Sequence, residues 1–217
     1  GSMIGATNNL ATLVLNANAG SMLNATYAFG QINVKDQGRI FFDPQGDDRT
    51  VTIGNVDIES SDTTGLIPGR VRFETNRSRG VLIASTMSIS GTGNSIIDVN
   101  ATAGGSVTGI NGNTGVTAGV SINALSNGNV ATRGLQKWGN GYLFIRGDSS
   151  STFNGAVSIE QGAIQVNHDG SLGTGAITLN RYGVLDINKA GTNGWTMTNS
   201  SLTYNAGSAE RWSIDGA

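Results

Sequence analysis

The chain has 217 residues, of which 33 are glycine and 2 are proline, and its formal net charge is −2. Charged residues make up only 13% of a chain rich in aliphatic residues, which excludes an intrinsically disordered protein. No basic run is present, which argues against a nucleic-acid partner or an anionic membrane surface. Glycine this frequent without a collagen repeat predicts short strands joined by many turns, and the absence of cysteine predicts a stacked core without disulfides.

The domain organisation is expected to be simple. Residues 1–3 are interpreted as a remnant of expression, and residues 4–217 as a single all-β domain. Neither a signal peptide nor an apolar run long enough to span a membrane is found. The chain ends at Ala217 with no evident polar cap, so we expect an excised fragment, cut in mid-structure.

Strands are predicted from pairs of the form aliphatic-x-aliphatic, because alternation with period two is typical of a strand with one buried face. The first clear strand is 11–15. Two ladders are then expected, one regularly spaced and one less even. The regular ladder contains Ile32/Val34, Val51/Ile53 and Val71/Phe73; the other contains Ile40/Phe42, Val56/Ile58 and Val81/Ile83. Segments 43–48 and 60–65 are expected to protrude as loops.

Residues 101–119 are rich in glycine, threonine and asparagine and carry no charge. They fit either a flexible linker or a thin run of tight turns and short strands. We favour the second interpretation, because Val107, Ile110, Val116 and Val120 still supply apolar side chains. Beyond them, Trp195/Met197 and Leu202/Tyr204 are expected to extend the ladder toward the C-terminus.

The most regular stretch runs from Leu135 to Ile187. One set of pairs begins at Leu143, Ile164 and Leu185, which are evenly spaced along the chain. A second set begins at Val157 and Ile177, which are separated by nearly the same interval. Two interleaved ladders that share one period predict a solenoid in which each turn of the chain lies on the previous turn.

This stretch also carries a family pattern. Lys137, Gly139-Asn-Gly141, Gly147, Asn154-Gly155, Gly162 and Gly170-Ser-Leu-Gly173-Thr-Gly175 alternate with strands. The arrangement resembles the autotransporter-associated β-strand repeat of bacterial autotransporter passenger domains, although Phe153, Arg146 and Asp148 depart from the usual residues. The resemblance covers about a quarter of the chain. It implies a right-handed parallel β-helix, which we expect to have turns of about 20 residues and about eight to ten turns.

Arg146-Gly147-Asp148 is the sharpest short motif. On an exposed turn it would bind integrins, the carboxylate reaching the receptor's metal ion and the guanidinium an acidic pocket. The alternative is that the repeat requires Gly147 and that Arg146 and Asp148 are ordinary solvated neighbours. A second candidate is the basic cluster Arg70, Arg72, Arg77 and Arg79, which would contact a glycan or an anionic surface, or else balance Asp57 and Glu59.

Catalytic constellations are not found. His168 is the single histidine and is expected in a turn, so a catalytic triad or a histidine-based zinc site has at most one imidazole. The nearest acidic groups are Asp57 with Glu59 on one strand face, which a neighbouring strand would bring beside Arg70 or Arg72, and Asp43, Asp47 and Asp48 in a loop that would bind calcium loosely. One group of aromatic residues would form a sugar-stacking platform, or else fill the wider turns or cover an end of the solenoid: Trp138, Trp195, Trp212, Tyr142, Tyr182 and Tyr204. We expect no cofactor and no metal.

The leading functional expectation is a non-enzymatic passenger segment that is secreted or exposed on the bacterial cell surface, exported through the outer membrane. It would act in adhesion to host cells, matrix or other bacteria, and as a virulence factor, through a host receptor, a glycan or self-association. One alternative is a secreted effector, a toxin or growth-factor-like ligand that binds one host receptor. Another is a carbohydrate-active β-helix enzyme, which would depend on Asp57 and Glu59. A purely structural spacer is the remaining possibility.

Overall fold

The computed structural model describes residues 2–4, 12–16, 24–26, 29–35, 38–43, 50–60, 70–75, 81–91, 95–101, 119–128, 133–188 and 196–212. These residues form strands and turns, and no helix occurs among them. The strands are β1 (Ser2–Ile4), β2 (Thr12–Asn16), β3 (Asn24–Thr26), β4 (Gln31–Lys35), β5 (Arg39–Asp43), β6 (Thr50–Thr52), β7 (Asn55–Ser60), β8 (Arg70–Thr75), β9 (Val81–Gly91), β10 (Ser95–Ala101), β11 (Gly119–Asn127), β12 (Leu135–Trp138), β13 (Tyr142–Ile145), β14 (Val157–Val166), β15 (Ile177–Ile187), β16 (Leu202–Tyr204) and β17 (Ala209–Trp212).

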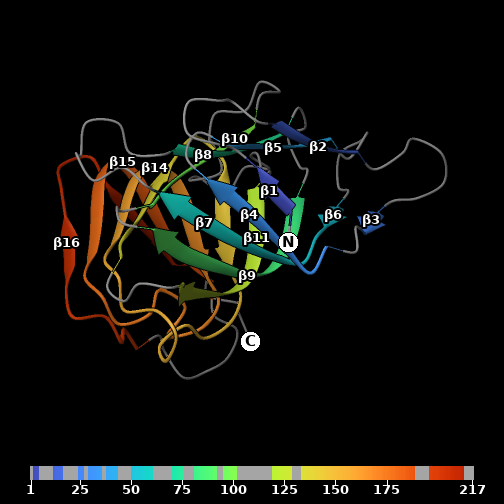
Figure 1. Cartoon of the computed structure of the whole chain (residues 1–217). Coiled ribbons are helices and arrows are strands. Elements are labelled where there is room, and N and C mark those ends of the chain that lie inside the picture. The colour runs from blue at the N-terminus through green and yellow to red at the C-terminus, as the bar shows by residue number, and fades with distance from the viewer. Residues whose placement is uncertain are drawn as a thin grey trace, which may run out of the picture.

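The strands pair in parallel throughout the described chain and form three ladders, which we call walls (Figure 1). The first wall contains β2, β5, β8, β10, β12, the first half of β14, the first half of β15, and β16. The second contains β3, β6, the first part of β9, the first part of β11, β13, the second halves of β14 and β15, and β17. The third contains β1, β4, β7 and the later parts of β9 and β11.

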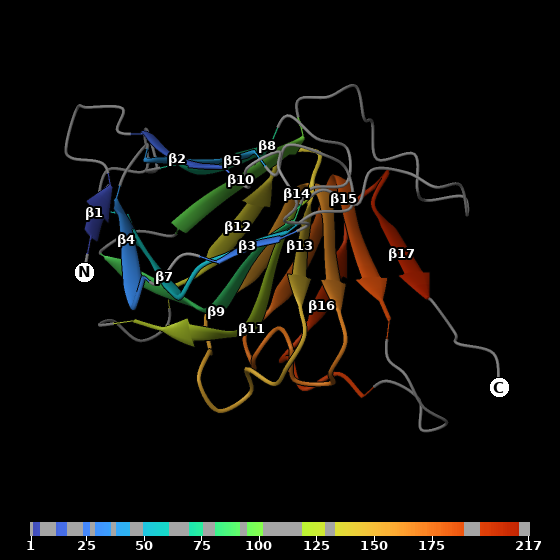
Figure 2. The same ribbon diagram turned by 90° about the vertical axis from the view of Figure 1, so that its right-hand side faces the viewer.

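The predicted all-β fold of stacked parallel strands is therefore confirmed. Strands β14 and β15 each pass from the first wall to the second, and their register shifts between Ile159 and Gln161, where the chain turns the corner. Gly162, just after that shift, has a φ of +71°, a backbone conformation that glycine adopts without steric cost. Figure 2 shows the strands stacked along the axis, from β1 and β4 at one side of the view to β17 at the other.

The core consists of aliphatic side chains that stack along the axis. One inner row of the second wall illustrates the rule, since six successive members are all fully buried. They are Val51, Leu82, Val120, Leu143, Ile164 and Leu185. Each strand thereby buries an apolar face that it could not bury alone, which is the source of stability in a solenoid.

The third side of the molecule changes along the axis. After β11 it is built from turns, residues 146–156, 167–176 and 196–201, which we call the turn stack. The junction is direct, because the Leu125 amide of β11 donates to Ser149 Oγ at 2.9 Å and the Asn127 amide donates to the Thr152 carbonyl at 2.7 Å. In the turn stack Phe153 supplies the buried core contact that strand residues supply earlier, and Leu172 does so on the next turn.

The register confirms part of the predicted pairing and corrects the rest. Leu143 pairs with Ile164 and Ile164 with Leu185, as their even spacing predicts, and Val157 pairs with Ile177. Strand β2 confirms the strand predicted at 11–15.

The two N-terminal ladders were assigned the wrong partners. Ile32 pairs with Val56 rather than with Val51, and Val51 pairs with Leu82 rather than with Val71. Similarly, Ile40 pairs with Phe73. Each turn there includes a third-wall strand, so a residue's partner lies further along the chain than even spacing predicts. Residues 44–49, 61–69, 102–118 and 189–195, which hold the predicted loops, the glycine-rich segment and Trp195, lie outside the described residues.

The second wall differs from the prediction of one buried face. Tyr142 and Phe144 of β13 are nearly fully buried on its outer side, where their rings stack with centroids 5.2 Å apart. Ala163 and Val184 of the next rungs join this outer apolar cluster. Asp186 of β15, which pairs with Gln165 of β14, is also buried, and it accepts a hydrogen bond from the Gln165 side chain at 2.9 Å.

Candidate functional site

The turn stack holds the candidate site, because it carries the Arg-Gly-Asp sequence and presents turns on one side of the molecule. Successive turns are joined along the axis by backbone hydrogen bonds. The Ser149 amide donates to the Gly170 carbonyl at 2.9 Å, and the Thr174 amide donates to the Phe153 carbonyl at 3.1 Å. On the next turn, the Ser200 amide donates to the Thr174 carbonyl at 3.0 Å. The turns are thus tied to one another as strands are.

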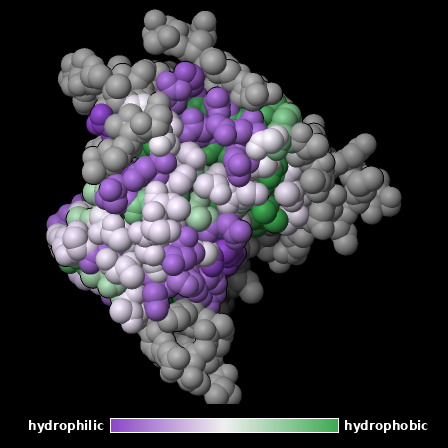
Figure 3. All heavy atoms as spheres, turned by 60° about the horizontal axis from the view of Figure 1, so that its bottom comes forward, coloured by the Kyte–Doolittle hydropathy of each residue, from purple (hydrophilic) through white to green (hydrophobic). Residues whose placement is uncertain are grey.

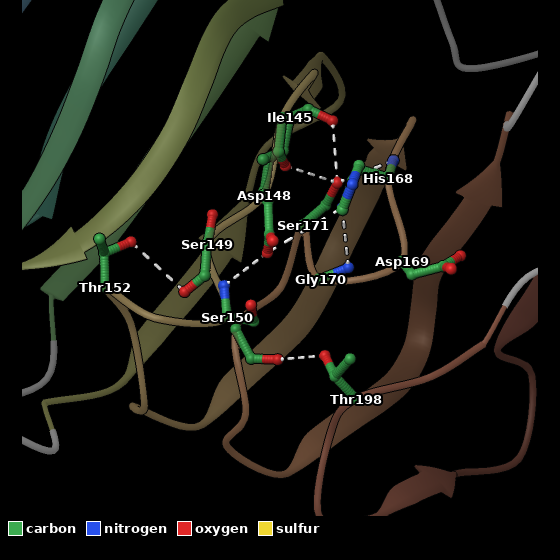
Figure 4. Close-up of polar contacts among 12 residues, drawn as sticks. Ile145, Asp148, Ser149, Ser150, Thr152, His168, Asp169, Gly170, Ser171 and Thr198 are labelled. Carbon is green, nitrogen blue, oxygen red and sulfur yellow. Dashed lines mark hydrogen bonds and ion pairs between the residues drawn. The ribbon is translucent and has the colours of Figure 1, made fainter.

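Buried hydroxyl groups reinforce this arrangement (Figure 4). Ser149 is fully buried, and its Oγ accepts the hydrogen bond from Leu125 of the preceding rung. Ser171 is 1% exposed; its Oγ accepts from the His168 amide at 3.1 Å and donates to the Gly147 carbonyl at 3.0 Å. Because a buried polar group without a partner costs about 1–3 kcal/mol, these serines specify the turn conformation.

Close packing of the turns explains two of the glycines. A Cβ atom on Gly155 would lie 1.7 Å from the Arg133 carbonyl oxygen, and one on Gly175 would lie 2.0 Å from the Gly155 carbonyl oxygen. Both obstacles are backbone atoms of the neighbouring rung, which cannot move aside without separating the turns. The asparagine–glycine and glycine-rich sequences of the family pattern therefore have a steric reason in this structure.

The outer edge of the turn stack carries a row of small polar side chains. Asn154 and Thr174 lie opposite each other on successive turns, and Ser200 lies one position further along on the next turn, opposite Gly175; all three are exposed. Asn127 Nδ2 donates to Asn154 Oδ1 at 2.7 Å, which extends the row to β11. Figure 3 views this side of the molecule, where hydrophilic and weakly polar surface predominates over hydrophobic surface. The row supplies hydrogen-bonding groups on a rigid backbone, at intervals of one rung.

Arg146 is held against the outer face of the second wall. Its Nη1 donates to Gln165 Oε1 at 3.1 Å and to Asn167 Oδ1 at 3.0 Å. Its guanidinium carbon lies 4.7 Å from the centre of the Phe144 ring, a cation–π contact, and Nε donates to Ser121 Oγ at 3.3 Å. The guanidinium therefore bridges three rungs of the wall.

Asp148 occupies the exposed part of the same turn. Its Oδ1 accepts from the Ser150 amide at 2.8 Å and lies 3.9 Å from His168 Nδ1. The hydrogen bonds from Ser150 are the main reason that the pKa of Asp148 lies below its usual value. His168 lies in a turn, as predicted, and its Nδ1 accepts from the Gly170 amide at 3.2 Å.

The structure thus separates the two charged groups of the motif by their roles. Both charged residues are exposed, but Arg146 is hydrogen-bonded along the wall, and Gly147 donates its amide to the Asn123 carbonyl at 2.7 Å. Binding to an integrin acidic pocket would require Arg146 to break its contacts with Gln165 and Asn167.

The predicted basic cluster is described only in part. Arg72 is exposed on the outer face of β8, and its register partners are Arg39 and Asp98. Arg39 forms an ion pair with Glu74, so the wall carries charges of both signs. The side chain of Arg70 and the residues Arg77 and Arg79 lie outside the described part, so the structure places none of these side chains beside Arg72.

The acidic pair Asp57 and Glu59 lies on the outer face of β7, as predicted, but its neighbours differ from those expected. Asp57 accepts from Ser90 Oγ at 2.6 Å, and Glu59 Oε2 lies 2.6 Å from Lys35 Nζ. Strand β7 pairs with β4 and β9, while Arg70 and Arg72 are on β8, which belongs to the first wall. The expected approach of Arg70 or Arg72 was therefore wrong. Asp47 and Asp48 lie outside the described residues, as does the side chain of Asp43.

Sequence reasoning missed the environment of Lys137. This lysine is fully buried in an inner row between Ile97 and Ile159. Its Nζ donates to the carbonyls of Trp138 at 2.7 Å, Gly139 at 3.0 Å and Gln161 at 3.2 Å, at the corner between the first two walls. The signal was present in the alternation, because Lys137 occupies the next inward position after Leu135.

Burial lowers the pKa of Lys137 from 10.5 to about 7, and the nearby carboxylate of Asp98 opposes this shift. Three carbonyl acceptors match the three N–H groups of a charged ammonium. Because Lys137 is fully buried and joins carbonyls of two strands and their connection, we interpret it as a residue that holds the corner together.

The exposed aromatic side chains of the described residues contact charged partners. Among the described residues the large exposed hydrophobic side chains are Tyr182 and Tyr204. Arg181 lies over the Tyr182 ring at 5.1 Å, at the corner of β15, while Tyr204 contacts Glu210 at the end of the stack. Tyr142 is buried, as noted above. The side chain of Trp212 is outside the described part.

Within the described residues, no group of three or more histidine, cysteine, aspartate or glutamate side chains is arranged to hold a metal ion. Helices long and apolar enough to cross a membrane are likewise not found in that part. Comparisons of this chain with protein-family models, curated proteins and solved structures gave no match.

Proposed function

We propose that this chain is a segment of an autotransporter passenger domain, a right-handed parallel β-helix with turns of about 20 residues in its C-terminal part. In this proposal the segment is exported through the outer membrane, is exposed at the cell surface or released, and acts in adhesion without catalysis. The register supports the repeat, since Leu143, Ile164 and Leu185 stack at equal intervals of sequence in the stretch that resembles the family pattern.

The observation that carries the adhesive role is the rigid row of exposed polar side chains on the turn stack. Asn154, Thr174 and Ser200 present amide and hydroxyl groups on successive rungs whose backbones are hydrogen-bonded to each other. Ordering such groups before binding reduces the conformational entropy lost on association. A partner would contact several rungs at once, so that many weak contacts add up along the stack.

The partner is a glycan or a protein of the host cell, the matrix or another bacterium. A row of neutral hydrogen-bonding groups suits either chemistry, and the low net charge gives no strong electrostatic selection. The carbohydrate-active enzyme receives no support from the described residues, because Asp57 and Glu59 are engaged by Ser90 and Lys35.

The experiment compares two matched variants in saturation binding to cultured host cells. Thr174→Arg places a long cation in the middle of the exposed row, while Thr203→Arg makes the same change on the exposed outer side of β16. We expect Thr174→Arg to weaken binding by about tenfold or more, since it blocks contact over neighbouring rungs, and Thr203→Arg to leave it nearly unchanged.

Equal losses in the two variants would contradict the turn stack as the contact surface. Absence of saturable binding by the unmodified chain to host cells, to matrix proteins and to bacterial cells would contradict the adhesive function itself.

A further inference from the structure

The corner between the first and second walls carries an exposed aromatic ring. On β14 the chain passes this corner from Ile159 to Gln161, whereas on β15 it passes from Leu179 to Tyr182, so β15 has one more residue here. A bulge of this kind redirects the side chains beside it and is common next to functional sites. Tyr182 projects from the corner, and 63% of its surface is exposed.

Arg181, which precedes Tyr182 in the bulge, lies over one face of the ring. Its guanidinium carbon is 5.1 Å from the ring centre, within the range of a cation–π contact. On the next rung Gly207 has a φ of +85°, and a Cβ atom there would lie 2.9 Å from Arg181 Cγ, so a larger residue would disturb this contact. The ring is thus held from one side before any ligand binds, which reduces the conformational entropy that binding would cost.

Hydrogen-bonded polar side chains lie beside the corner, on the outer face of the first wall. Asn180 Nδ2 donates to Glu160 Oε2 at 2.7 Å, and Ser158 Oγ donates to Glu160 Oε1. Asn205 Nδ2 in turn donates to Asn180 Oδ1 at 2.5 Å. A carboxylate offers about four lone-pair sites, so Glu160 keeps acceptor capacity for the hydroxyl groups of a ligand while its two oxygens are already held in place.

Gln161 joins the ring to this polar group. It follows Glu160 in the chain, lies directly opposite Tyr182 in the register and is exposed. An aromatic ring beside a carboxylate and an amide suits a sugar, whose C–H face stacks on the ring and whose hydroxyl groups bond with the carboxylate and the amide. Glu160 and Arg181 carry opposite charges, so the group favours a ligand without net charge.

We propose that the corner around Tyr182 is a binding site for a neutral glycan. Tyr182 supplies the stacking surface, Glu160 accepts hydrogen bonds from sugar hydroxyl groups, and Gln161 supplies an amide. The site lies where the first wall passes into the second, apart from the turn stack, which connects the two walls on the third side. It is therefore independent of the adhesive row proposed above.

Affinity electrophoresis in native gels that contain a soluble polysaccharide tests the proposal. The panel consists of a neutral glucan, a neutral mannan and a neutral galactan, with an anionic polyuronate for comparison. The variants are Tyr182→Ala, which removes the ring, Tyr182→Phe, which keeps it, and Glu160→Gln, which removes the charge of the acceptor. The matched control is Tyr204→Ala, because Tyr204 is the other large exposed hydrophobic residue of the described part. Circular dichroism checks that the β structure persists.

We expect at least one neutral polysaccharide to retard the unmodified chain. Tyr182→Ala should weaken this binding by about tenfold or more, and Glu160→Gln by about threefold or more, since each removes a direct contact. Tyr182→Phe and Tyr204→Ala should each change it by less than about twofold. Thr174→Arg, in the turn stack, should leave it unchanged, so this site and the adhesive row can fail separately.

The proposal is overturned if no neutral polysaccharide retards the folded, unmodified chain, or if the polyuronate alone does so. Folded Tyr182→Ala that binds as tightly as Tyr204→Ala would also overturn it. If Tyr182→Ala loses its β structure, Glu160→Gln decides, and unchanged retardation of that variant would contradict the site. Loss of retardation in Thr174→Arg, with none in Tyr182→Ala, would place the glycan on the turn stack instead.

Discussion

The N-terminal and C-terminal parts of this stack solve the same packing problem differently. Up to β11 the core is enclosed by three walls of strands, and Val56 and Met87 lie on its third side. After β11 the third side consists of the turn stack, where Phe153 and Leu172 supply the buried contacts. A turn of chain that lacks one strand is shorter. Partners in β12 to β15 are therefore closer in sequence, as Leu143 is to Ile164, than Val56 is to Met87 on the third wall.

The difference teaches where specificity comes from in each part. Strands of the N-terminal part are aligned by ladders of hydrogen bonds and tolerate connections of varied length. The turn stack depends on individual residues, such as buried serines and glycines in contact with the neighbouring rung. Substitutions at the closely packed glycines of the turn stack should therefore have larger effects than those at open positions of the N-terminal part such as Gly30. Gly54 of the N-terminal part belongs with the closely packed glycines, since its Cβ atom would lie 1.9 Å from the Phe29 carbonyl oxygen.

Glycine substitutions test this contrast most strongly. Gly155→Ala places a Cβ atom 1.7 Å from the Arg133 carbonyl oxygen, while Gly30→Ala has no atom within 4 Å. We expect the first to lower the free energy of unfolding by about 4 kcal/mol, because the rungs must separate, and the second by less than about 0.5 kcal/mol. Urea denaturation measures both. Similar losses of unfolding free energy in the two variants would contradict this contrast.

The buried corner lysine should give the stability a distinctive pH dependence. The pKa of Lys137 is lowered from 10.5 to about 7 in the folded chain. Between these values the unfolded chain holds the proton and the folded chain releases it, so the free energy of unfolding rises with pH in this window. Below pH about 7 both states are protonated, and the contribution to the slope vanishes.

The variant Lys137→Met isolates this contribution, because methionine fits between Ile97 and Ile159 without a titrating group. We expect the unmodified chain to gain up to about 1.4 kcal/mol per pH unit relative to the variant between pH about 7 and 10.5. Urea denaturation at a series of pH values gives the difference. Parallel pH profiles for the two proteins would show that the lysine is not held in this environment.

A surface ion pair in the N-terminal part should matter much less. Lys35 Nζ lies 2.6 Å from Glu59 Oε2, and both side chains are about one-third exposed. Lys35→Met should cost at most about 1 kcal/mol at low salt and less at high salt, since exposed ion pairs are weak and screened. Thermal unfolding at two salt concentrations measures this. A large loss of stability that does not depend on salt would contradict this expectation. It would mean that single substitutions destabilise the third wall as much as the turn stack.

The Arg-Gly-Asp turn should give the smallest effect. Arg146 is hydrogen-bonded to Gln165 and Asn167, so it would have to break these contacts to enter an integrin pocket. Asp148→Glu should therefore change binding to cultured cells by less than about twofold, and a soluble Arg-Gly-Asp peptide should not compete. Loss of saturable binding in Asp148→Glu, with competition by the peptide, would mean that Arg146 leaves the wall on binding.

Alternation predicted most of the strands and the all-β fold, but not β1, β3 or β17, and β1 includes residues that were interpreted as a remnant of expression. It also predicted the register where turns are short, as for Leu143 with Ile164. It failed for Ile32 and Val51, because equal spacing along the chain indicates pairing only if every turn of the chain has the same number of walls. The inward position of Lys137 could be predicted, but its carbonyl partners depend on the corner geometry.

The candidate site was predictable to a similar extent. The exposed position of Asp148 and the turn at His168 follow from the residues, and both are confirmed. The wall contacts of Arg146 were not predictable, because Gln165 and Asn167 reach it only through a register that brings residues of successive turns side by side. The row of Asn154, Thr174 and Ser200 has the same origin, as does the pairing of Tyr204 with Glu210.

Cysteine cross-linking tests the register, and with it the contrast between the two parts, most directly, because the natural chain contains no cysteine. Asp57→Cys with Ser88→Cys, on the third wall, joins outward-facing partners, as does Ser158→Cys with Thr178→Cys on the first wall. Directly adjacent parallel strands are about 4.8 Å apart, within the range for a disulfide. Both double variants should oxidise to intramolecular disulfides. The control is Asn33→Cys with Thr52→Cys, the pair that equal spacing along the chain would place side by side, and it should form no disulfide. A disulfide in this last variant, with none between positions 57 and 88, would contradict the three-walled N-terminal part.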